Sequence, residues 1–194
     1  MRGNRHRLLT FGVLAGTAAL LGAGVPAEAF PARGVPAKEV SAEKWVKSVC
    51  TSLGDWAEDL AAAQEGVDRS ETDLDQTKDN LVAYLDDVTD ATDALLKRLK
   101  KAGTPDVEDG KGVVTAFRKG FSQARDTFAD AADDAESLDT DDTSQFEEDV
   151  VDIQDAIAAG ADDIGATFDE ADEKYDVPEL DDAFEAEPSC SGIT

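Results

Sequence analysis

Four stretches of this chain carry apolar residues spaced alternately three and four positions apart. They cover residues 41–67, 70–101, 104–138 and 144–175. This spacing puts the apolar residues on one stripe of an α-helix, and each stripe must be buried against another element. No segment alternates apolar and polar residues as a half-buried strand does. The pattern therefore predicts four helices and no sheet.

Each predicted helix opens on residues that favour a helix N-terminus. Ser41 is a candidate N-cap for the first helix, and the second is expected to begin near Ser70. Thr104 and Pro105 open the third, since proline suits the first helical position, where its missing N–H is not needed. Ser144 is the expected start of the fourth helix, in a capping-box pattern.

Short connections between long helices make consecutive helices antiparallel neighbours. We therefore predict an all-α fold, an antiparallel up-down four-helix bundle with a disulfide-tethered C-terminal tail. The predicted organisation along the chain is a signal peptide over 1–29, a flexible leader over 30–38, the four-helix bundle over 39–177 and the tail over 178–194.

The first 29 residues have the pattern of a secretory signal peptide. Three arginines precede an apolar run over residues 8–25, and Ala27 and Ala29 then supply the small residues that a signal peptidase reads. We predict cleavage between Ala29 and Phe30 and secretion, with retention at the cell envelope left open. The alternative is a retained membrane anchor, but this run is only marginally long enough to span a bilayer.

The two cysteines, Cys50 and Cys190, lie near opposite ends of the predicted mature chain. Two cysteines in an exported protein form a disulfide more often than not. In an up-down bundle the start of the first helix and the end of the fourth lie at the same end, so the tail can return to Cys50. We therefore predict an intrachain Cys50–Cys190 bond rather than an intermolecular one, and a monomer.

The chain has a formal net charge of −26. Nucleic acid and anionic membrane surfaces would be repelled by this charge, so neither is an expected partner. Cationic envelope components and divalent ions are partners that the charge permits. Solubility alone is the simplest reason for so many acidic residues.

The residues needed for most catalytic and metal chemistry are missing. The single histidine, His6, lies in the predicted signal peptide, so the mature chain has no imidazole for general-base catalysis or for ligation of zinc or haem. The segment from Asp139 resembles the start of a calcium loop, but Ser144 stands where such a loop has glycine and Val150 where it has glutamate. We predict no catalytic residues, no cofactor and no metal site.

Aromatic residues and glycines on the predicted stripes raise the question of a ligand site. Because they follow helical spacing, we expect the aromatic residues to belong to the core rather than to a ligand site: Trp45, Trp56, Phe117, Phe121 and Phe128. Gly110 and Gly160 lie at stripe positions, where they could allow close helix approach or leave a gap for an apolar ligand. The sequence alone does not decide between close helix approach and a gap for a ligand.

Four short motifs carry a resemblance to a known group of proteins: Trp45-x-Lys47-x-Val49-Cys50, Gly103-x-Pro105-x-Val107, Leu138-Asp139-Thr140-x-Asp142 and Pro188-Ser189-Cys190. On these motifs the chain resembles the small secreted proteins, often lipoproteins, of actinobacteria. The resemblance implies an exported helical domain with Cys50 paired to Cys190, and it assigns no activity and no site residues. The chain departs from the lipidated members because no cysteine follows the cleavage site, which favours free secretion.

The leading functional hypothesis is a non-enzymatic exported helical bundle that acts by binding or within the cell envelope. The alternative is a small-molecule or cation carrier that uses a cavity between helices or the acidic surface. An enzyme that uses only carboxylates, such as the pairs Glu147/Glu148 and Asp162/Asp163, ranks third, because carboxylates fill every outward face of the predicted helices.

Overall fold

The computed structural model describes residues 39–67 and 72–191. The predicted signal peptide and leader lie outside them. The described elements are β1 (Glu39–Val40), α1 (Ala42–Glu65), α2 (Leu74–Ala102), β2 (Thr104–Pro105), α3 (Gly110–Glu136), α4 (Thr143–Lys174), α5 (Pro178–Ala186) and the 3-10 turn η1 (Pro188–Cys190). Within these residues, no helix is both long enough and apolar enough to cross a bilayer.

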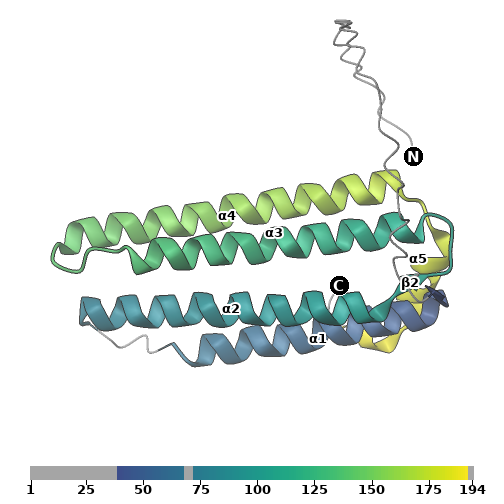
Figure 1. Ribbon diagram of the computed structural model, residues 1–194, viewed down its shortest axis with the longest axis horizontal. Helices are drawn as coiled ribbons and strands as arrows, with labels where there is room; N and C mark the ends of the chain where they lie inside the picture. The colour runs from purple at the N-terminus through teal and green to yellow at the C-terminus, as the bar shows by residue number, and fades with distance from the viewer. Residues whose placement is uncertain (1–38, 68–71, 192–194) are drawn as a thin grey trace, which may run out of the picture. The chain divides into compact units, whose positions relative to one another are not determined.

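The helices pack in chain order, α1 on α2, α2 on α3 and α3 on α4, while α5 and η1 return to α1. Consecutive long helices run in opposite directions (Figure 1). The prediction of a mostly helical fold is confirmed. The segment expected to be a tail contains the fifth helix, which covers the amphipathic stretch around Leu180 and Phe184.

Ser41 is the N-cap residue of α1, as predicted. Helix α2 begins at Leu74, and Ser70, near which its start was predicted, lies outside the described residues. Asp73 is its N-cap, and the Asp73 carboxylate accepts a hydrogen bond from the Gln76 backbone amide. The carboxylate satisfies one of the amides that a helix leaves unpaired in its first turn, so it marks the start of the helix.

The predicted start of α4 differs from the structure by a smaller margin. Asp142, not Ser144, is the N-cap residue, and its carboxylate accepts hydrogen bonds from the backbone amides of Ser144 and Gln145. An ionised carboxylate at this position satisfies two amides at once and also interacts favourably with the helix dipole. Asp142 therefore takes the role that the sequence pattern assigned to Ser144.

The predicted start of α3 is wrong. Thr104 and Pro105 do not open a helix but form β2, which pairs in parallel with β1. The Asp106 amide then donates to the Val40 carbonyl, which continues the pairing beyond the strands. This pairing holds the segment extended, so α3 begins only at Gly110. Strands of two residues are too short to produce an alternating pattern, so apolar periodicity does not reveal them.

Gly160 allows close approach of two helices, and Gly110 allows close approach of the preceding strand β2. A Cβ atom on Gly160 would lie 2.5 Å from the hydroxyl oxygen of Thr127 on α3, so α4 lies directly against α3 at this point. A Cβ atom on Gly110 would collide with the backbone carbonyl of Pro105. At both glycines, the space that a side chain would need is already filled by neighbouring atoms.

The buried apolar residues form two clusters. The first, called here the disulfide-end core, comprises Trp45, Val46, Val49, Cys50, Leu95, Leu99, Ala102, Phe121, Val177, Leu180, Ala183 and Cys190. The second, called here the distal core, comprises Leu85, Ala131, Ala132, Ala135, Leu138, Phe146 and Ile153. Helices α1 and α5 contribute only to the disulfide-end core.

The predicted bond between Cys50 and Cys190 is present. It joins residues 140 positions apart, with a Cα–Cα distance of 5.0 Å. Both cysteines are buried in the disulfide-end core. By the loop-closure entropy argument, a link over so long a loop raises the free energy of unfolding by up to about 5 kcal/mol.

Two glycine substitutions should have opposite effects on stability. We expect Gly54→Ala to raise the free energy of unfolding by about 0.5–1 kcal/mol, because the new methyl group meets nothing within 4 Å and alanine favours the helix. Gly160→Ala should lower it by about 1–2 kcal/mol, because the methyl group forces Thr127 aside. Urea unfolding of the two variants measures both effects. Stabilisation by Gly160→Ala would show that α3 and α4 are not closely packed there.

Candidate functional site

A connected set of aromatic rings links α1, α3, α4 and α5. Ring centroids are 5.6 Å apart for Trp56 and Phe121, 5.7 Å for Phe121 and Phe168, 5.6 Å for Phe168 and Phe117, 5.7 Å for Phe117 and Trp45, and 6.2 Å for Trp45 and Phe184. These contacts are edge-to-face, the arrangement that the charge distribution of aromatic rings favours. The predicted core role is thus confirmed for Trp45 and Phe121, both of which are buried.

One buried hydroxyl group fixes part of this set. Thr92 of α2 is fully buried, and its oxygen accepts a hydrogen bond of 3.2 Å from the Trp56 indole nitrogen. The same hydroxyl donates to the Val88 carbonyl. Because buried polar groups are costly when unpaired, this pair of bonds favours one position of the Trp56 ring.

Two glycines of α3 make room for aromatic side chains at the C-terminal end of α4. A Cβ atom on Gly120 would lie 2.6 Å from the ring of Phe168, and one on Gly112 would collide with the ring of Tyr175. Both rings therefore lie directly over the α3 backbone. This close contact explains how α4 is held at its C-terminal end, where it buries little besides Thr167.

A groove opens where α3, the end of α4 and α5 meet. Its volume is about 550 Å³, within the usual size of a small-molecule site. Four partly buried aromatic residues line it: Phe117, Phe168, Tyr175 and Phe184. Aliphatic side chains of Val113, Val177 and Leu180 also contribute. We call this site the aromatic groove.

The edge of the aromatic groove is acidic. Asp169, Asp172 and Asp181 are exposed residues that line it, two from α4 and one from α5. The ammonium group of Lys174 lies 5.0 Å from the centroid of the Tyr175 ring, which is a cation–π distance. The groove thus combines apolar ring surface with negative charge at its edge.

Helix α5 forms one wall of the groove and is also packed against the disulfide-end core. Leu180 and Ala183 are buried in the disulfide-end core, and the Phe184 ring contacts Trp45 of α1. Beyond α5, Cys190 is bonded to Cys50. The position of this wall therefore depends on contacts with α1, although α1 does not line the groove itself.

The turn η1, which carries Cys190, has its own cap. The Glu187 carboxylate accepts hydrogen bonds from the Ser189 amide and hydroxyl group, and these bonds lower the pKa of Glu187. A lowered pKa means that the ionised form stabilises the fold. The contribution is present above the usual glutamate pKa and is lost as the pH falls through the lowered value.

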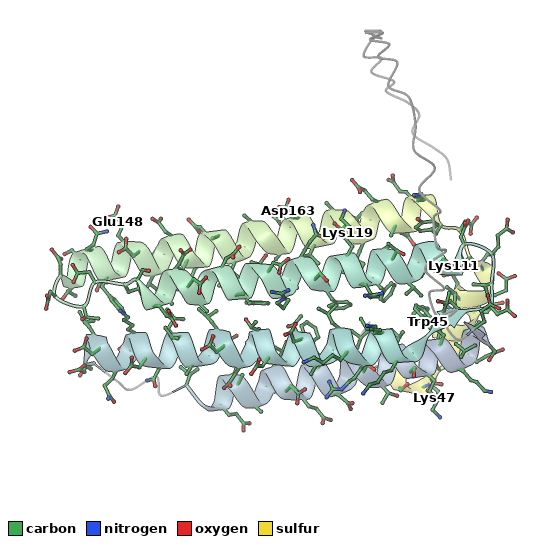
Figure 2. All side chains as sticks on the ribbon, viewed as in Figure 1. Trp45, Lys47, Lys111, Lys119, Glu148 and Asp163 are labelled. Carbon is green, nitrogen blue, oxygen red and sulfur yellow. A yellow bond between two sulfur atoms is a disulfide. The ribbon has the colours of Figure 1, made fainter. Side chains whose placement is uncertain are left out.

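The other carboxylates considered in the sequence analysis have structural or solvent-facing roles. Asp139 accepts a hydrogen bond from the Asp141 amide, just as Asp142 caps α4, so this loop uses its carboxylates on its own backbone. Glu148 and Asp163 lie on the exposed side of α4 (Figure 2). In the described ranges, no group of three or more His, Cys, Asp or Glu side chains is arranged to hold a metal ion.

The aromatic groove was not predicted from the sequence. Phe168 and Tyr175 lie on the apolar stripe predicted for the fourth helix, where they are indistinguishable from core residues. Phe184 belongs to the amphipathic stretch of the tail. A signal for α5 was available in Pro178 followed by Glu179 and Asp181, because proline at the first helical position and acidic residues in the first turn favour a helix N-terminus.

Comparison of the chain with protein-family models, with curated proteins and with solved structures finds no match. The case for a function therefore rests on the described residues. Among these, the aromatic groove is a site where aromatic surface, charge and a hollow of suitable size occur together.

Proposed function

We propose that this protein is an exported, non-enzymatic binding protein built on an antiparallel up-down helical bundle, with the aromatic groove as its binding site. The observation that carries the proposal is the set of four aromatic residues around one hollow, each of which keeps part of its surface exposed. Exposed ring surface gains free energy when a ligand removes it from water. Sites for small molecules are typically concave, mostly apolar and edged by a few polar groups.

The titratable groups of the groove support binding rather than catalysis. Its carboxylates, Asp169, Asp172 and Asp181, are exposed to solvent. A general acid or base works best when burial or a neighbouring charge brings its pKa close to the working pH. Exposed carboxylates suit a different role, which is attraction of a charged ligand towards the apolar surface.

Export is supported by the signal-peptide pattern of the first 29 residues and by the Cys50–Cys190 disulfide, since disulfides persist mainly in oxidising compartments. The resemblance to small secreted actinobacterial proteins agrees with this proposal.

A small-molecule or cation carrier is the alternative function. A carrier that binds its ligand in a cavity between helices is not supported at Gly110 and Gly160, because neighbouring atoms fill the space beside each glycine. A carrier would use the aromatic groove instead. It would differ from a binding protein in releasing its ligand to a partner.

Export predicts a defined N-terminus for the protein outside the cell. In its host, the chain should accumulate in the culture medium or the envelope fraction and begin at Phe30. Mass spectrometry of the intact protein measures this, because loss of 29 residues changes the mass by a known amount. Full-length protein found only in the cytosol would refute export.

Groove binding predicts that filling the hollow abolishes binding. Ala171 lines the groove, so Ala171→Trp should occupy it, while Ala158→Trp places the same side chain on an exposed position of α4 outside the groove. In ligand-observed NMR with a mixed set of acidic, basic and neutral fragments, we expect hits with the unaltered protein and with Ala158→Trp, and none with Ala171→Trp.

Hits that survive in Ala171→Trp would place binding elsewhere on the molecule. A complete lack of hits with the unaltered protein would remove the support for a binding function. Circular dichroism of both variants checks that each keeps its helical content.

A further inference from the structure

We infer that the ligand of the aromatic groove is an organic cation with an apolar body, such as an alkylammonium or quaternary ammonium compound. This inference rests on the proposed function and names the chemical class of its ligand. It follows from the rings of the groove, from its charge, and from the ammonium group of Lys174, which contacts one of these rings although Lys174 does not line the groove.

The rings supply the first part of the recognition. The faces of aromatic rings carry partial negative charge and attract cations, most strongly where water is excluded. Phe117 and Phe168 contact each other edge-to-face, and Tyr175 lies over Gly112 beside them. Phe184 approaches from α5. Rings on two sides of one hollow can contact both an alkyl chain and an ammonium group.

Lys174 shows that one of these rings accepts an ammonium group. Its Nζ atom is 5.0 Å from the centroid of the Tyr175 ring, and the side chain is exposed. An exposed cation–π contact is weak, and a lysine side chain is flexible. A ligand cation can therefore share or replace this contact at little cost.

The charge of the groove selects the sign of the ligand. Asp169, Asp172 and Asp181 line it, and none of its lining residues is basic. An anionic ligand would meet these carboxylates as well as the strongly negative charge of the whole chain. A neutral apolar ligand would gain ring contacts but nothing from the aspartates. A cation with an apolar body uses both.

A second acidic hollow provides a control. Between the end of α3 and the start of α4, a smaller hollow of about 240 Å³ is lined by Asp134, Asp149 and Asp152, together with Leu138 and Ile153. It has three aspartates, as the aromatic groove does, but none of its lining residues is aromatic. Binding driven by negative charge alone would treat the two hollows alike.

The test is calorimetric titration of the purified oxidised protein at low salt with three probes of equal chain length: octyltrimethylammonium, octan-1-ol and octane-1-sulfonate. We expect the cation to bind one equivalent, at least about tenfold more tightly than octanol, and the sulfonate to produce no binding heat.

Two triple variants with the same change in charge locate the binding. We expect Asp169→Asn/Asp172→Asn/Asp181→Asn to weaken cation binding about tenfold, and Asp134→Asn/Asp149→Asn/Asp152→Asn to change it by less than about twofold. Tyr175→Leu should weaken binding about fivefold, while Tyr175→Phe, which keeps the ring, should not.

Equal weakening by both triple variants would mean general association of cations with an acidic surface, and would overturn the inference. Octanol binding as tightly as the cation would overturn it too, while leaving the groove as a binding site. If no probe binds, the inference is wrong, and the fragment experiment with Ala171→Trp then decides separately whether the groove binds anything.

Discussion

The bond between Cys50 and Cys190 is the constraint on which the end of the molecule with the aromatic groove depends. Helix α5 has nine residues, and isolated helices of that length are unstable in water. It buries only Leu180 and Ala183. The disulfide keeps this helix close to α1, so its few apolar contacts need not overcome the entropy of a free chain end. Fixing α5 in turn places one wall of the groove.

The acidic composition makes such local constraints important. Helix α4 carries eleven acidic residues and one basic residue, Lys174, and it buries only Phe146, Ile153 and Thr167. Repulsion among these charges opposes a compact fold. Close packing against α3 offsets it, through Gly160 at Thr127 and through the rings of Phe168 and Tyr175 over α3 glycines. The aromatic residues that hold α4 in place also line the groove, so stability and the proposed binding use the same side chains.

Periodicity made the long helices predictable, and the position of the cysteines at one end of an up-down arrangement made their pairing predictable. Short elements whose conformation depends on distant partners were not predictable. The extended conformation of Thr104 and Pro105 depends on β1, a partner more than sixty residues earlier in the chain. The groove depends on how α5 packs, and sequence spacing cannot separate a partly exposed Phe168 from a buried Phe121 on the same kind of stripe.

Hydrogen exchange tests the central claim, that the disulfide holds α5 and thereby the groove. Amide exchange is measured in the oxidised protein and in the Cys50→Ser/Cys190→Ser variant. Mass spectrometry detects it in peptides from α5 and from the distal core. The account predicts that amides of residues 178–186 lose protection in the variant, while those of residues 131–153 keep it, because local unfolding follows local contacts. Unchanged protection of α5, or equal loss in both regions, would contradict it.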